Sequence, residues 1–81
     1  MLTRIMRTAL IRQVRAQRRM PSPALARAIR EAAGVSQGRI AEELGVDRVT
    51  VTRWETGLRR PRGERASAYA ELLSQLKRAV E

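Results

Sequence analysis

The sequence predicts an all-α fold, a compact bundle of five helices that begins with a basic amphipathic helix. Three observations predict it. Apolar residues recur at steps of three and four, which is the helical period, and no segment alternates between apolar and polar residues over the length of a strand. Proline or glycine separates the periodic segments. At 81 residues the chain forms one small domain, near the size at which burial alone suffices for folding.

Residues 1–20 are predicted to form the basic amphipathic helix, and residues 21–81 the domain that follows it. The first segment has six arginines and no acid, whereas the second has eleven basic and eight acidic residues. Its apolar residues share one side of the helix, and five of its six arginines project to the other side. Its longest apolar run is three residues, too short for a secretory leader or a membrane span. The apolar side consists of Leu2, Ile5, Met6, Ala9, Leu10 and Val14.

The second helix is predicted to start after Ser22 and to run to about Ala33. Pro21 and Pro23 end the first helix because neither can continue it, and Ser22 then suits the N-cap with a proline at the first helical position. Gly34 supplies a left-handed stop. The face expected to point inward consists of Leu25, Ala28, Ile29 and Ala32.

The third and fourth helices are short and close together. Ser36 and Asp47 are their predicted N-caps, and the helices are expected to end at Leu44 and at about Thr56. A glycine follows each of them, as is typical of a helix end.

A basic loop at 58–63, with the sequence LRRPRG, leads to the last helix, which is predicted to start near Glu64. This helix has one continuous apolar stripe, which indicates that it packs on the others along its length. The stripe consists of Tyr69, Leu72, Leu73, Leu76 and Val80.

The composition restricts the classes of function. Seventeen basic residues and eight acidic residues give a net charge of +9, for which a polyanion is the natural partner. The chain has no cysteine and no histidine. The first absence excludes disulfides and thiolate metal sites, and the second removes the commonest general base and metal ligand. We therefore expect no enzyme activity, cofactor, metal or small-molecule substrate, and a location in a reducing bacterial cytoplasm, at the nucleoid.

The segment from Gln37 to Trp54 has the pattern of two helices that cross at a steep angle. Gly45 can take a positive φ without steric cost, and Ala41 is small where the backbones come closest. This combination predicts a helix-turn-helix, whose second helix enters the major groove of DNA. A plain helical hairpin in a small α-domain is the alternative. The inward positions are Ile40, Ala41, Leu44, Val46, Val51 and Trp54.

Residues 29–64, IREAAGVSQGRIAEELGVDRVTVTRWETGLRRPRGE, carry a family resemblance. The chain is similar over about residues 23–76 to the Cro/repressor-type (XRE-like, lambda-repressor-like) helix-turn-helix domains of temperate phages and bacterial regulators. The most specific matches are Gln37, Ala41, Gly45, Trp54, Glu55, Gly57 and Pro61. The resemblance implies a five-helix fold that binds operators as a homodimer and represses transcription, with Arg30 and Glu55 as a structural salt bridge. The chain departs from the family by its N-terminal arm and by ending after one C-terminal helix.

Four residues on the outer side of the fourth helix are expected to contact bases. Arg48 and Arg53 can each donate two hydrogen bonds to guanine, the commonest specific contact. Val49 suits the methyl group of thymine, as the resemblance to a phage repressor with valine and tryptophan at matching places also implies. Thr50 is the fourth predicted base contact. Trp54, whose phase is inward, is expected in the core.

Contacts to the DNA backbone are expected on both sides of that helix. Gln37 stands at a helix N-terminus, where N–H groups and the helix dipole favour a phosphate. Thr52 is a further candidate, with a nearby base edge as its alternative partner. The other predicted backbone contacts are the loop residues Arg59, Arg60 and Arg62.

The arm, residues 1–20, is expected to pack its apolar side on the body or on a second copy. Some of its arginines would then lie near DNA phosphates, namely Arg4, Arg7, Arg15 and Arg18. The expected partner is a double-stranded operator, bound by a homodimer that is a monomer when free. Two alternatives stay open: an antitoxin-type or cellular regulator of the same fold that also binds a protein, and a basic module for RNA or membranes.

Overall fold

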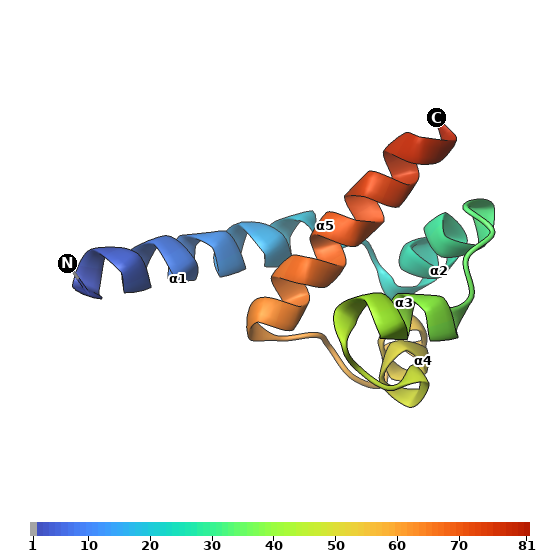
Figure 1. The fold of residues 1–81 in the computed structure, drawn as a ribbon, viewed down its shortest axis with the longest axis horizontal. Helices are drawn as coiled ribbons and strands as arrows, with labels where there is room; N and C mark the ends of the chain where they lie inside the picture. Colours follow the sequence, from blue (N-terminus) through green and yellow to red (C-terminus); the bar gives the residue numbers. More distant parts are fainter. Residues whose placement is uncertain (1) are drawn as a thin grey trace.

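The computed structural model describes the backbone of residues 2–81 and the side chains of residues 6–81. Over this part of the chain it contains five helices and no strand, so the predicted all-α fold is confirmed. Figure 1 shows α2, α3 and α4 gathered at one side of α5, while α1 extends away from them. The helices are α1 (Leu2–Arg19), α2 (Pro23–Ala32), α3 (Gln37–Leu44), α4 (Arg48–Thr56) and α5 (Gly63–Val80).

Side-chain caps fix the starts of the three short helices, as predicted. The side chains of Ser22, Ser36 and Asp47 accept hydrogen bonds from the backbone N–H groups three residues later, at 3.2, 3.0 and 2.8 Å. Gly45 ends α3 with φ +68°, a left-handed conformation that lets the chain turn into α4 within three residues. The helix boundaries therefore follow from local sequence chemistry.

The core lies where α2, α3, α4 and α5 meet. Ile40, Val51 and Leu73 are its largest fully buried side chains. Trp54 is buried, and its ring lies 4.8 Å from that of Tyr69, centroid to centroid. Trp54 is therefore a core residue, as its inward phase predicts.

The predicted inner face of α2 is wrong in part. Ile29 is buried, but Leu25, Ala28 and Ala32 are exposed, and Ala26 lies in the core instead. The apolar residues of α2 cover more than half of its circumference, opposite Arg27, Arg30 and Glu31, so periodicity alone does not select which part of that wide face points inward. Arg30 determines which face of α2 points inward, because its side chain turns inward to reach Glu55 on α4.

Helix α1 lies against the first half of α5, and the two helices run in the same direction (Figure 1). Ala16 is fully buried there, and Arg12 and Arg19 form ion pairs with Glu64 and Glu71 at 3.9 and 3.7 Å. A small residue at the contact allows the two helices to approach closely.

The predicted packing of the apolar side of α1 on the body is wrong for three of its four described side chains, and Ala9 is half-buried. Met6, Leu10 and Val14 are 69%, 58% and 46% exposed. The side chains of Leu2 and Ile5 lie outside the described residues. The small face at Ala16 meets α5 instead of the larger apolar side, and packing on a second copy stays a prediction.

Candidate nucleic-acid interface

The outer side of α4 carries the four residues predicted to contact bases. Arg48, Val49 and Arg53 are exposed and Thr50 is half-buried, while Val51, Trp54 and Glu55 of the same helix point into the core. Within the described residues, neither Arg48 nor Arg53 forms an ion pair. Both guanidinium groups are therefore available to an external acceptor.

Asp47 fixes the start of α4. One oxygen of its carboxylate accepts hydrogen bonds from the hydroxyl and the backbone N–H of Thr50, at 2.7 and 2.8 Å. These two bonds lower the pKa of Asp47. Thr50, predicted from sequence as a contact to DNA, thus also helps to cap its own helix.

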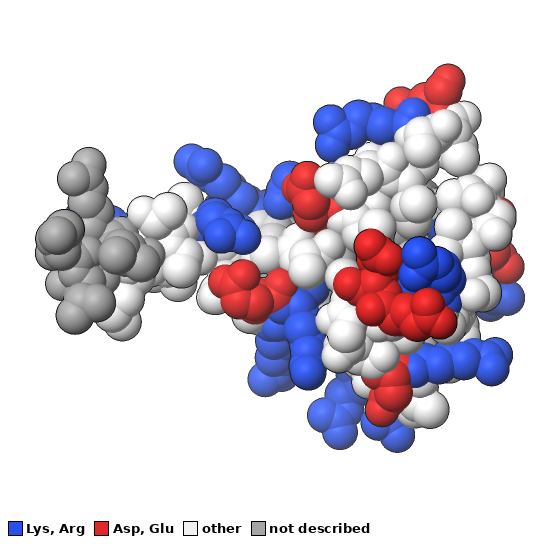
Figure 2. All heavy atoms as spheres, viewed as in Figure 1, with Lys and Arg blue, Asp and Glu red and all other residues white. Residues whose placement is uncertain are grey.

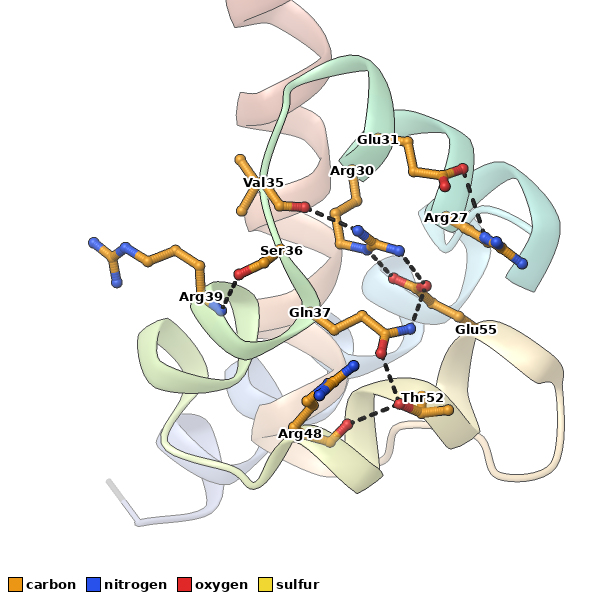
Figure 3. A network of polar contacts seen from close by, with 10 residues as sticks. All are labelled: Arg27, Arg30, Glu31, Val35, Ser36, Gln37, Arg39, Arg48, Thr52 and Glu55. Carbon is orange, nitrogen blue, oxygen red and sulfur yellow. Dashed lines mark hydrogen bonds and ion pairs between the residues drawn. The ribbon is translucent and has the colours of Figure 1, made fainter.

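A nearly buried ion pair connects α2 to α4 (Figure 3). Arg30 Nε donates to Glu55 Oε2 at 2.6 Å and Arg30 Nη2 donates to Glu55 Oε1 at 2.9 Å, while Nη1 donates to the carbonyl of Val35. The side chains of Arg30 and Glu55 are only 11% and 2% exposed. This is the pair that the family resemblance implies, and its two parallel bonds fix the orientation of α4.

Gln37 extends this pair to α3. Its Nε2 donates to Glu55 Oε1 at 3.0 Å, and its Oε1 accepts the hydroxyl of Thr52 at 2.8 Å (Figure 3). Sequence reasoning assigned Gln37 to a phosphate and Thr52 to a phosphate or a nearby base edge, and it missed this bridge. No local pattern signals it, because the partners lie fifteen and eighteen residues apart.

The stability that this network provides depends on pH through the protonation of Glu55. Burial raises its pKa, but the hydrogen bonds from Arg30 and Gln37 outweigh burial, so the pKa lies below its ordinary value of 4.5. A carboxylate whose pKa is lowered by folding stabilises the fold at pH values above its unfolded-state pKa. This contribution is lost as the pH falls through its folded-state pKa.

We therefore expect the stability advantage of the native chain over Glu55→Gln to shrink as the pH falls below the ordinary glutamate pKa of 4.5 and through the lowered folded-state pKa of Glu55. Urea unfolding of both proteins across this range measures it. Asp47 titrates in both proteins, so its contribution cancels in the difference. A difference that stays constant with pH would contradict the role of ionised Glu55.

Two basic hollows flank α4. One, of about 700 Å³, lies between α4, the following loop and the start of α5. Its arginines are Arg53, Arg59, Arg60, Arg62 and Arg65. Helix α5 begins here without a side-chain cap, so its first N–H groups and its positive dipole end add to the field of the arginines.

The second hollow, of about 550 Å³, lies at the N-terminus of α3. Arg27, Arg48 and Gln37 are among its lining residues. Sequence reasoning missed Arg27 here and Arg65 in the first hollow. The spacing of Arg62 and Arg65, three residues apart at a helix start, was a signal for the latter.

The charges divide the surface into different faces. Figure 2 shows basic side chains along the edge that α4 and the following loop form, and an acidic group on the face where α3 lies. Helix α3 carries Glu42 and Glu43, and both pair with Arg39. Glu42 and Glu43 thus lie away from the outer side of α4, whereas Asp47, the exposed N-cap, lies next to Thr50 on that helix.

A helix-turn-helix whose second helix presents unpaired arginines between two basic hollows defines a DNA-binding regulator of transcription. A family model described as helix-turn-helix matches residues 27–75, more than half of the chain. The chain therefore belongs to the XRE-type helix-turn-helix family, as its sequence predicts. Comparisons with curated proteins and with solved structures gave no match. Among the described helices, none has the length and apolar character needed to cross a membrane.

Proposed function

We propose that this protein binds a double-stranded operator sequence-specifically and represses transcription there, as a phage Cro-like protein or a small immunity repressor. One observation carries the proposal: the outer side chains of α4 have no ion pairs within the described residues, while its inner side chains hold the helix in place. Arg48 and Arg53 would read guanines, and Val49 and Thr50 would read neighbouring base edges.

The two basic hollows would hold phosphates on either side of the major groove. Arg59, Arg60 and Arg62 serve one of them, with Arg65 as an addition. Gln37 serves the other, because one N–H of its amide remains after the bond to Glu55. Thr52 would first have to release its bond to Gln37 in order to donate to a phosphate.

Selection of bound sequences from a random duplex pool tests the function. One recognition helix reads only a few base pairs, so we expect a palindrome whose half-sites lie about 34 Å apart and two proteins per duplex. Sedimentation with and without the selected duplex measures the stoichiometry. One protein on a site without dyad symmetry would exclude the dimer, and recovery of no preferred sequence would exclude the function.

Replacing Arg60 tests the phosphate assignment. Arg60→Ala should weaken binding to the selected site and to random DNA by a similar factor and reduce the slope of log K against log salt by about one unit, because one fewer counterion is released. Titrations at several salt concentrations measure this. Arg78→Ala, at the far end of α5, is the matched control and should leave the slope unchanged. A loss confined to the selected site would show that Arg60 reads bases instead.

A second candidate is an antitoxin-type or cellular regulator of the same fold that also binds a protein. The exposed apolar side chains of α1 favour it, since DNA contacts do not cover them. Co-purification of a second small protein with the chain from its natural host would support this function.

A further inference from the structure

Helix α1 carries an exposed row of apolar side chains. Met6, Leu10 and Val14 follow one another at four-residue steps and so form one ridge on the helix surface. Figure 1 shows that the first half of α1 extends beyond the start of α5, where no other helix lies beside it. We call these three residues the α1 strip.

Two arginines stand at the edge of the α1 strip. Helical spacing places Arg7 three residues before Leu10 and Arg18 four residues after Val14. Neither forms an ion pair with any side chain that the structure describes. Arg12 and Arg19 both have acidic partners on α5, and Arg18 lines the same hollow between α1 and α5 without forming an ion pair within the described residues.

The contact of α1 with α5 shows what kind of helix surface packs against α1. It combines a buried small residue, Ala16, with two Arg–Glu pairs whose members are spaced seven residues apart on both helices. The α1 strip and its arginines form one side of a similar helix–helix contact, with larger apolar residues than Ala16. The missing half is a helix with apolar side chains and carboxylates.

A second copy of this chain does not supply that half. Seven of its eight acids are already engaged: five pair with exposed arginines, Asp47 caps α4, and Glu55 is buried against Arg30. Helix α1 itself contains no acid, so two α1 helices would bring arginines together. DNA would neutralise the arginines but would leave the apolar strip uncovered. A membrane needs a broad apolar face, and part of α1 is covered by α5.

We propose that the α1 strip is the docking site for an acidic amphipathic helix of another protein. The partner helix places apolar side chains against Met6, Leu10 and Val14 and carboxylates against Arg7 and Arg18, which are eleven residues, or about 16 Å, apart along α1. This site lies outside the residues of the helix-turn-helix and does not depend on the proposed operator.

The test uses the full chain and a synthetic 18-residue helix with leucines at four-residue steps flanked by glutamates. Binding is measured by fluorescence anisotropy at 0.15 M salt. We expect Leu10→Ser/Val14→Ser to weaken binding at least tenfold and Arg7→Gln/Arg18→Gln to weaken it several-fold. Leu25→Ser and Arg78→Gln, matched in type and exposed elsewhere, should have no effect.

Three outcomes would overturn the proposal. Equal binding of a control peptide with serines in place of leucines would show that only charge is recognised. Self-association in sedimentation that Leu10→Ser/Val14→Ser abolishes would identify a second copy as the occupant. Binding to phosphatidylglycerol vesicles, lost in the same variant, without binding to the peptide, would identify a lipid surface. Binding of random duplex DNA should be unchanged in the strip variant, so failure of this proposal is distinguishable from failure of DNA binding.

Discussion

Glu55→Ala should lower the free energy of unfolding by about 3–5 kcal/mol, because it leaves the guanidinium of Arg30 nearly buried without its carboxylate. A domain of this size has a total stability of only about 4–12 kcal/mol, so the loss is a large fraction of it. Urea unfolding, followed by the fluorescence of Trp54, measures the change. Glu31→Ala, which removes an exposed pair with Arg27, is the control and should cost at most about 1 kcal/mol.

A double variant separates the ion pair from the packing around it. Arg30→Met/Glu55→Leu removes both charges and fills similar volume, and it should recover most of the stability that Glu55→Ala loses. Its DNA affinity should nevertheless stay below that of the native protein, because Gln37 loses its acceptor and the orientation of α4 is less restricted. If Glu55→Ala costs less than about 1 kcal/mol, the pair does not hold the fold together.

Arg53→Ala should weaken binding to the preferred operator by about 1–3 kcal/mol, which is about 5- to 150-fold. Arg53 is exposed on α4 and has no ion pair within the described chain, so its loss should leave the unfolding free energy almost unchanged. Discrimination at one base pair should relax, while affinity for random DNA falls much less. Titration against the operator and its single-base variants measures both effects.

Arg53→Lys provides a second variant that keeps the charge. Lysine cannot form the same planar pair of hydrogen bonds with guanine, so most of the discrimination should be lost and the salt dependence retained. Unchanged base preference in Arg53→Ala would exclude this residue as a base contact.

The sequence was sufficient to predict the five helices, because serine, aspartate, glycine and proline act locally at their ends. It also placed Trp54 and Val51 inside, since α4 has a clear inner phase. It failed on the inner face of α2 and on the packing of α1. Four of the ten residues of α2 are alanine, and a residue that small fits the inside and the outside equally well. On α1 the buried residue is Ala16 rather than one of the larger apolar residues.

The polar network around Glu55 could not be predicted from the sequence, for a different reason. The bonds of Gln37 to Thr52 and Glu55 depend on the angle at which α3 crosses α4. The periodicity of the sequence does not indicate such an angle between helices. The hollow at the start of α5 likewise joins Arg53 and Arg65, which are twelve residues apart. Candidate base contacts were easier to select, because an exposed position on one short helix follows from phase alone.

The separation of α4 into an inner and an outer row affects how readily such a protein can change its target. Arg48, Val49 and Arg53 take no part in the core, so substitutions at these positions would change the proposed base contacts at little cost in folding. A change at Thr52 would instead disturb the contact of α4 with α3, and a change at Glu55 would disturb three helices at once. Under the proposed function, a lineage of such proteins would acquire new binding sites through single substitutions in the outer row, without compensating changes inside.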